Sequence, residues 1–144
     1  MENIEFMLDI DMPKEKVWES LTDKEKLRKW WGEKNIKMEP RMDGEFHQSQ
    51  TKNDGTLIST HGTVIMVVLN HRLSFTWKRD DWDGETLVTF YLLPQNEKTK
   101  LYFLHSEWNS LSVLIREKQK SVLREMWKEK LANLKSFVET GKIR

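Results

Sequence analysis

Hydrophobic and polar positions alternate along residues 4–10, a pattern typical of a strand with one buried face. The period then changes, because Val17, Trp18 and Leu21 recur at helical spacing. Pro13 precedes them at a position that a first helical turn tolerates. The pattern therefore predicts one strand followed by a short helix.

A second short helix is predicted over residues 23–31. Thr22 and Glu25 have the spacing of a capping box, in which each side chain accepts a hydrogen bond from the backbone N–H of the other residue. Gly32 is well placed to end this helix, since glycine readily adopts the left-handed conformation found after a helix C-terminus.

The middle of the chain predicts further strands, over residues 44–50, 62–69, 72–78, 85–93 and 100–108. These segments are rich in Val, Thr, Phe, Tyr and Trp, and turn residues such as Asp54, Gly55 and Gly84 separate them. Short connections of this kind join antiparallel neighbours. Alternation turns Val88 towards the interior and Thr89 towards solvent.

The last part of the chain predicts one long amphipathic helix that stops at Gly141. Its apolar residues recur at three- and four-residue steps and are Leu123, Trp127, Leu131, Leu134 and Val138. We therefore expect an α+β fold, a curved antiparallel sheet of about six to seven strands around a long C-terminal helix, because a sheet must bury its apolar face. The two short helices after the first strand would cap one end of the groove.

The composition is that of an ordinary globular chain, with 38% hydrophobic and 33% charged residues. Its length predicts a single domain, residues 1–144. Basic and acidic residues number 24 and 23, so the chain lacks the cationic surplus of a nucleic-acid-binding protein. The absence of cysteine excludes disulfides and thiolate chemistry. Neither a signal sequence nor an apolar run long enough for membrane insertion is visible, which predicts a cytoplasmic protein.

Five segments carry a family resemblance, and they are residues 17–32, 72–77, 87–90, 99–105 and 127–134. They contain the strings VWESLTD and WWG, RLSFTW, LVTF, TKLYFLH and WKEKLANL. In this order they resemble the family named after the activator of heat-shock protein 90 ATPase homologue, over residues 4–139. Met126 is a departure, because the family often has glycine before the tryptophan that corresponds to Trp127.

That family belongs to the START-like, or SRPBCC, superfamily, which also contains birch-pollen-allergen-like and polyketide cyclase proteins. The resemblance implies a helix-grip fold with a cavity between the sheet and the long helix, and it links the chain to the stress response. It also makes contact with a chaperone a hypothesis. The eukaryotic co-chaperone carries a separate N-terminal domain without a counterpart in this sequence, so we expect no chaperone activation by this chain alone.

The four histidines, His47, His61, His71 and His105, do not have the spacing of a metal site. His61 and His71 are expected in exposed loops. His105 lies on the inward face of its strand, and we interpret it as a histidine paired with neighbouring polar groups. The alternative is a group that orients a ligand or acts as a general base. The acidic turn at residues 80–85 is expected to be solvated rather than to bind calcium.

The remaining signal is a set of mostly large inward side chains that we expect to line a ligand cavity. The set is Trp30, Trp31, Phe46, Phe75, Trp77, Val88, Phe90, Phe103, His105, Met126 and Trp127. Small-molecule pockets are typically apolar with few polar groups. Our leading hypothesis is therefore an intracellular carrier or sensor of a small hydrophobic or aromatic molecule, a monomer or dimer without catalysis, metal or cofactor.

Two alternatives remain open. One is an enzyme of the polyketide cyclase type, in which His105 and the aromatic residues orient a polyphenolic substrate. The other is a chaperone-interacting module. A hydrogen bond between His105 and a carboxylate would favour the enzyme, and a large exposed apolar patch would favour the module.

Overall fold

A computed structural model describes residues 3–33 and 35–143. The elements are β1 (Ile4–Ile10), α1 (Lys14–Thr22), α2 (Lys24–Trp31), β2 (Lys37–Met38), β3 (Glu45–Thr51), β4 (Leu57–Val68), β5 (Arg72–Arg79), β6 (Thr86–Gln95), β7 (Lys98–Ser106), η1 (Trp108–Ser110) and α3 (Val113–Thr140). Within the described residues seven strands form one antiparallel sheet, in the order β1-β7-β6-β5-β4-β3-β2. No helix in these two ranges is long and apolar enough to cross a membrane. The predicted absence of a signal sequence rests partly on residues 1 and 2, which lie outside the described residues.

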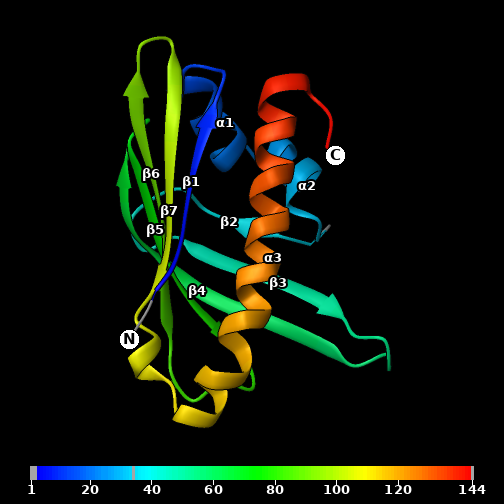
Figure 1. The fold of residues 1–144 in the computed structure, drawn as a ribbon. Helices are drawn as coiled ribbons and strands as arrows, with labels where there is room; N and C mark the ends of the chain where they lie inside the picture. The colour runs from blue at the N-terminus through cyan, green and yellow to red at the C-terminus, as the bar shows by residue number, and fades with distance from the viewer. Residues whose placement is uncertain (1–2, 34, 144) are drawn as a thin grey trace.

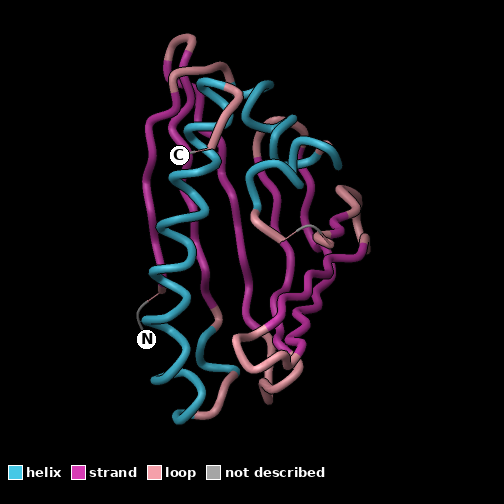
Figure 2. Tube along the Cα trace, turned by 90° about the vertical axis from the view of Figure 1, so that its right-hand side faces the viewer, coloured by secondary structure: helices cyan, strands magenta, loops and turns pink. Residues whose placement is uncertain are grey.

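The sheet curves around α3, and the three α-helices lie on the same side of it (Figures 1 and 2). Helices α1 and α2 cover one end of the groove, beside the C-terminal part of α3 (Figure 1). This arrangement confirms the expected helix-grip fold. It follows from the sequence because the strands have one strongly apolar face, and α3 with the two short helices buries that face.

The first strand, β1, pairs with the last strand, β7, and this pairing joins the two ends of the sequence. Ile4 lies opposite His105, and Phe6 lies opposite Phe103. On the next strand Val88 also lies opposite His105, and both side chains are fully buried. The inward face predicted from alternation is therefore the face that forms the core.

Several predicted strand boundaries differ from the structure. β4 begins at Leu57 rather than at Gly62, because the polar residues between them hide the apolar alternation. The two-residue strand β2 is too short to show a period in the sequence. β7 ends at Ser106, since Glu107 adopts a left-handed conformation with φ of 66° that breaks the strand and leads into η1.

The predicted capping box is wrong. Thr22 is the last residue of α1, and its hydroxyl donates a hydrogen bond to the carbonyl of Trp18 (2.8 Å). Asp23 instead caps α2, and its carboxylate accepts a hydrogen bond from the Lys26 N–H (3.0 Å). An acidic side chain there satisfies a free N–H and complements the helix dipole. Gly32 follows α2 as predicted, with φ of 108°.

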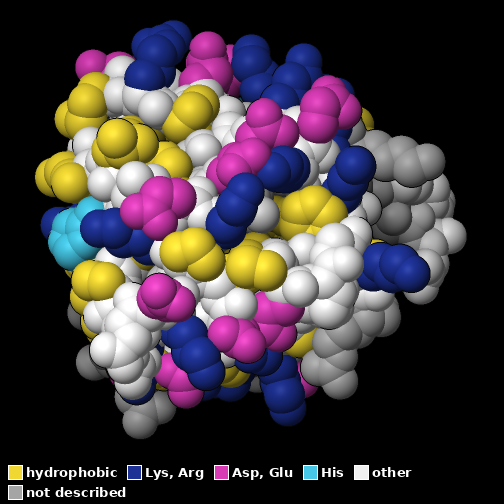
Figure 3. All heavy atoms as spheres, turned by 90° about the horizontal axis from the view of Figure 1, so that it is seen from above, with side chains coloured by type: hydrophobic (Ala, Val, Ile, Leu, Met, Phe, Trp, Pro, Cys, Tyr) yellow, Lys and Arg dark blue, Asp and Glu magenta, His cyan; other side chains and the backbone are white. Residues whose placement is uncertain are grey.

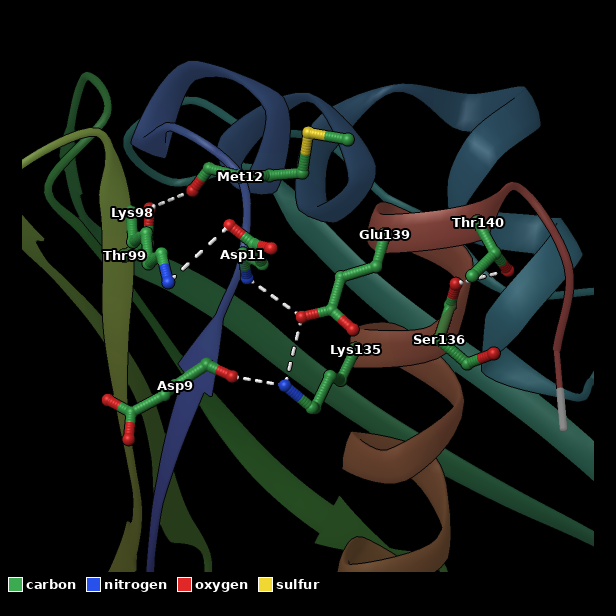
Figure 4. A network of polar contacts seen from close by, with 9 residues as sticks. All are labelled: Asp9, Asp11, Met12, Lys98, Thr99, Lys135, Ser136, Glu139 and Thr140. Carbon is green, nitrogen blue, oxygen red and sulfur yellow. Dashed lines mark hydrogen bonds and ion pairs between the residues drawn. The ribbon is translucent and has the colours of Figure 1, made fainter.

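A polar network ties β1 to the last turns of α3 (Figure 4). The Asp11 N–H donates to the Glu139 carboxylate (2.7 Å), and the Lys135 ammonium donates to the same oxygen (2.9 Å) and to the Asp9 carbonyl. Partial burial alone would raise the pKa of Glu139, but the Asp11 N–H and Lys135 together outweigh it and lower that pKa. Seen from this end of the molecule, acidic and basic side chains are interspersed over the surface (Figure 3).

Replacing Glu107 with glycine should raise the free energy of unfolding. A non-glycine residue at φ of 66° is strained by roughly 1–2 kcal/mol, whereas glycine adds roughly 0.5–1 kcal/mol of unfolded-chain entropy. The difference predicts a net gain of up to about 1.5 kcal/mol, measured by urea denaturation. Glu107→Ala keeps the Cβ and is the control. An equal gain in that control would show that backbone strain is not the source.

Candidate functional site

Trp127 projects from α3 into the centre of the interior and is fully buried. Its indole contacts five other rings, at centroid distances of 4.5 Å for Phe103, 5.2 Å for Trp77, 5.6 Å for Trp31, 6.1 Å for His105 and 6.4 Å for Phe90. Aromatic pairs at such distances stabilise the core beyond the area they bury. The space between α3 and the sheet is therefore occupied at its centre by this indole.

His105 is fully buried, and both of its ring nitrogens are hydrogen bonded. The indole N–H of Trp127 donates to Nδ1 (3.0 Å), so Nδ1 carries no proton. Nε2 lies 2.7 Å from the hydroxyl of Thr86, which itself donates to the carbonyl of Trp77 (2.9 Å). Because the Thr86 proton is used in that bond, Nε2–H is the donor to Thr86. One continuous chain of hydrogen bonds thus runs from α3 through β7 and β6 to β5.

This chain of hydrogen bonds keeps the imidazole neutral. Burial lowers the pKa of His105 to about 3, and a second proton would have to enter at Nδ1, where Trp127 already donates. A general base needs an accessible lone pair and a pKa near the working pH. The partners of His105 are an indole and a hydroxyl rather than a carboxylate, which favours its interpretation as a paired core residue.

A small apolar cavity lies between the sheet and the helices α1 and α2, beside the edge strand β2. Its lining residues are Leu21, Leu27, Trp31, Ile36, Met38, Phe46, Leu73, Phe75 and Phe90. The cavity measures about 10 Å³, which is near the lower limit for one water molecule. None of these lining residues belongs to α3, so the cavity is not the one expected between the sheet and the long helix.

The structure places the predicted ligand-binding residues in three different surroundings. Four of them line the cavity, namely Trp31, Phe46, Phe75 and Phe90. Six others are fully buried outside this lining, namely Trp30, Trp77, Val88, Phe103, His105 and Trp127. Met126 is half-buried and borders an open groove on the outer surface of α3.

Trp77 carries an unpaired donor close to the cavity. The residue is 1% exposed, and its indole nitrogen has no hydrogen-bond partner among the described residues. Its ring stacks on Phe46, a lining residue, at a centroid distance of 5.3 Å. An unsatisfied buried donor destabilises a protein by roughly 1–3 kcal/mol, so such groups are uncommon. Trp77 therefore offers an unused donor beside the aromatic wall.

Lys130 is a charged residue within the core, and the sequence pattern did not indicate its burial. Its ammonium donates to the Trp31 carbonyl (2.5 Å) and to the Glu33 carboxylate (2.7 Å), and it lies 4.9 Å from the centre of the Trp31 ring. Burial lowers the pKa of Lys130, while Glu33 opposes that shift. Lys130 thus satisfies a free carbonyl at the end of α2 and fixes α2 to α3.

The acidic residues of the turn after β5 are exposed to solvent, as expected, and some of them also have partners within the protein. Asp80 pairs with His61 (3.1 Å), and Asp83 accepts a hydrogen bond from the Ser112 N–H at the start of α3 (3.1 Å). His61 is exposed, but it belongs to β4 and not to a loop as predicted. Within residues 3–33 and 35–143, no group of three or more His, Asp or Glu side chains is arranged to hold a metal ion.

Sequence reasoning missed five of the lining residues. Helical spacing could have identified Leu21 and Leu27, and alternation could have identified Leu73 on the predicted strand 72–78. Ile36 and Met38 carry no such signal, because they belong to a short segment without a period.

Solved structures share this architecture. DynU16, a protein of the dynemicin biosynthetic locus, is 20% identical with a TM-score of 0.79, and the match covers 99% of this chain and 49% of DynU16. CV1439 from Chromobacterium violaceum is 20% identical with a TM-score of 0.78, and the match covers 95% of this chain and 96% of CV1439. The Aha1 dimer from Colwellia psychrerythraea is 22% identical with a TM-score of 0.77 and coverage of 99% of each chain. This chain thus spans about half the length of DynU16. A comparison with curated protein sequences finds no match.

The curved sheet, the long gripping helix and the aromatic interior define a START-like helix-grip protein. The model of the family described as Activator of Hsp90 ATPase homolog 1-like protein matches residues 11–139. The chain belongs to this family, which confirms the resemblance carried by its five sequence segments.

The low pKa of His105 predicts a specific loss of stability in acid. An unfolded histidine has a pKa near 6.5. Below that pH His105 is protonated in the unfolded chain, whereas in the folded chain it stays neutral down to about pH 3. The contribution of neutral His105 to the free energy of unfolding is fully present above pH 6.5. It falls by about 1.4 kcal/mol per pH unit as the pH decreases below that value. Urea denaturation of the wild type and His105→Gln between neutral and acid pH should show this slope only in the wild type.

Because carboxylates titrate in both proteins, the difference between the two pH profiles isolates His105. Nuclear magnetic resonance of the wild type gives an independent measurement that does not depend on the variant being folded. The imidazole signals of His105 should stay unchanged down to at least about pH 4. A midpoint near pH 6 would contradict the hydrogen-bond assignment.

Proposed function

We propose that the chain is a cytoplasmic carrier or sensor that binds a small hydrophobic or aromatic molecule within a single START-like domain. The observation that carries this proposal is the apolar cavity beneath α1 and α2, walled by Trp31, Phe46, Phe75 and Phe90. Small-molecule sites are typically concave and lined by apolar and aromatic side chains, as this cavity is. Membership in the family supports ligand binding in general, and the cavity supports a location for it.

The volume of the cavity decides how binding must occur. A space of about 10 Å³ does not admit an aromatic molecule. Side chains of α1 and α2, such as Leu21 and Leu27, must therefore move outwards when a ligand enters. The free energy of that movement subtracts from the affinity, so we expect a modest affinity and slow association. Native mass spectrometry of freshly purified protein is the direct search for a bound molecule.

The enzyme alternative loses its principal candidate residue, because both nitrogens of His105 are engaged. DynU16 comes from a biosynthetic locus, but a likeness at 20% identity concerns the fold. The chaperone-interacting alternative is favoured by the family name alone. A several-fold increase of chaperone ATPase turnover by this chain would support that alternative over a carrier.

Enlarging the cavity should increase the affinity for an apolar probe. Leu73 lines the cavity, so Leu73→Ala adds space where the ligand is proposed to bind. We expect N-phenylnaphthylamine to bind the wild type saturably and Leu73→Ala at least about threefold more tightly, since less rearrangement is needed. The substitution should also lower the free energy of unfolding by about 2–5 kcal/mol.

The matched control is Leu92→Ala. Leu92 is equally buried on the inward face of the sheet but does not line the cavity. It should lose a similar free energy of unfolding, also about 2–5 kcal/mol, without a change in probe affinity. Equal affinities of both variants and the wild type would place the probe elsewhere. Probe binding seen only when the near-UV circular dichroism is lost would indicate a molten state.

The unpaired indole of Trp77 predicts a preference for ligands with an acceptor oxygen. Fluorene and fluorenone have nearly the same shape, but fluorenone carries a carbonyl. We expect the wild type to bind fluorenone about fivefold more tightly, as one hydrogen bond contributes on the order of 1 kcal/mol. Trp77→Phe keeps a ring without the N–H and should bind the two compounds equally. A preference that persists in Trp77→Phe would exclude Trp77 as the donor.

A further inference from the structure

Two histidines face each other across the antiparallel strands β3 and β4 (Figure 1). His47 lies opposite His61 in the register of these strands, and the centres of their imidazole rings lie 4.8 Å apart. Phe46, the neighbour of His47, packs against Trp31 in the core, so alternation along β3 turns His47 to the outer face of the sheet. The sequence did not indicate this pair, because the two residues come from different strands and meet only through the register.

The distance between the two rings fits the coordination of one metal ion by both. A transition metal ion binds an imidazole nitrogen at about 2.0–2.1 Å, so the ion lies about 3.2 Å from the centre of each ring. Square-planar and tetrahedral geometries set an angle of about 90° to 109° at the ion, which places the two ring centres about 4.5–5.2 Å apart. The observed separation of 4.8 Å falls within this range.

Asp80 leaves one nitrogen of His61 available to such an ion. The Asp80 carboxylate lies 3.1 Å from Nε2 of His61. Because a carboxylate only accepts, Nε2 of the neutral ring carries the proton and Nδ1 carries the lone pair. Histidines that bind metals almost always donate their other N–H to a carboxylate, a carbonyl or water, and that partner fixes the tautomer. The imidazole of His47 has no hydrogen bond or ion pair within the described residues, so its nitrogens are also available.

Two lysines lie at the ends of the same cross-strand row and reduce its attraction for a cation. Lys37 of β2 and Lys78 of β5 flank the histidine pair on either side. Glu45 is ion-paired with Lys37 (3.0 Å), and the carboxylate of Asp80 offsets the charge of Lys78. The local charge is therefore balanced, and the affinity for an ion has to come from the two imidazole nitrogens.

We propose that His47 and His61 form a binding site for a divalent transition metal ion such as Zn²⁺, with Asp80 as a positioning residue. The described residues contain no group of three or more ligating side chains, so the site has two protein ligands. The side chain of His61 is 58% exposed, which lets water fill the other coordination positions. Imidazole suits Zn²⁺, Cu²⁺ and Ni²⁺, whereas Mg²⁺ and Ca²⁺ prefer oxygen ligands. A bound ion joins β3 to β4, next to Phe46 in the cavity wall.

Isothermal titration calorimetry of the full chain with Zn²⁺ provides the test. Two protein ligands are half of a four-ligand structural site, so we expect one ion per chain with a dissociation constant on the order of 10 µM. His47→Gln and His61→Gln should each raise this constant at least about tenfold, because chelation by two linked nitrogens is lost. For the same reason the double variant should bind no more weakly than either single variant. Mg²⁺ should show no binding under the same conditions.

The positioning role of Asp80 has its own test. Asp80→Ala removes the acceptor of the His61 N–H and should raise the dissociation constant about three- to tenfold. Asp80→Asn keeps an oxygen in that place and should recover most of this loss. Nuclear magnetic resonance of the imidazole nitrogens, recorded without metal, should show the Nε2–H tautomer of His61 in the wild type and a mixture of tautomers in Asp80→Ala. A general loss of stability would not produce that change of tautomer.

The matched control is His71→Gln, which should leave the dissociation constant unchanged. His71 is also exposed, but it lies in the turn between β4 and β5 and does not belong to the pair. A wild type without saturable Zn²⁺ binding below about 1 mM would overturn the proposal. So would unchanged affinity in the double histidine variant, or a loss in His71→Gln as large as the losses in the single variants of the pair.

Discussion

The burial of the Trp127 indole is the constraint from which the polar order of the interior follows. A broad curved sheet faces a single long helix, and a large ring from α3 closes the distance between them. That ring brings an N–H group into the core, which needs an acceptor. His105 supplies the acceptor at Nδ1, and its own N–H then needs Thr86, whose proton in turn reaches the Trp77 carbonyl. One buried indole therefore specifies the tautomer of a histidine and the identity of two further partners.

The same indole determines where space is left for a ligand. Because Trp127 occupies the region beneath α3, the apolar cavity lies beneath α1 and α2. Trp31 contacts both regions, since it packs edge-to-face against Trp127 and lines the cavity. Lys130 of α3 donates a hydrogen bond to the backbone carbonyl of Trp31, so a charged contact fixes this wall of the cavity to α3. Entry of a ligand and the packing of α3 are thus connected through Trp31.

Local patterns in the sequence were sufficient for the fold but not for the site. Alternation identified β1 and the inward position of His105, and helical spacing identified α3, because these depend on neighbours along the chain. The partners of His105 come from β6 and α3, and no local pattern reports such distant pairs. The alternation rule also placed Thr89 in solvent, where its larger neighbours in fact cover it. The position of the cavity could not be predicted from the sequence, because it depends on how side chains from several helices and strands pack against one another.

All seven tryptophans are buried, and this has a spectroscopic consequence. Trp30, Trp31, Trp127 and Trp77 form an unbroken series, with successive centroid distances of 5.3, 5.6 and 5.2 Å. At such separations excitation energy migrates between indoles before it is emitted. The intrinsic emission is therefore a collective property of the core, blue-shifted and poorly accessible to aqueous quenchers. The wavelength of the emission maximum therefore reports whether the sheet is still packed against α3, rather than the surroundings of any one tryptophan.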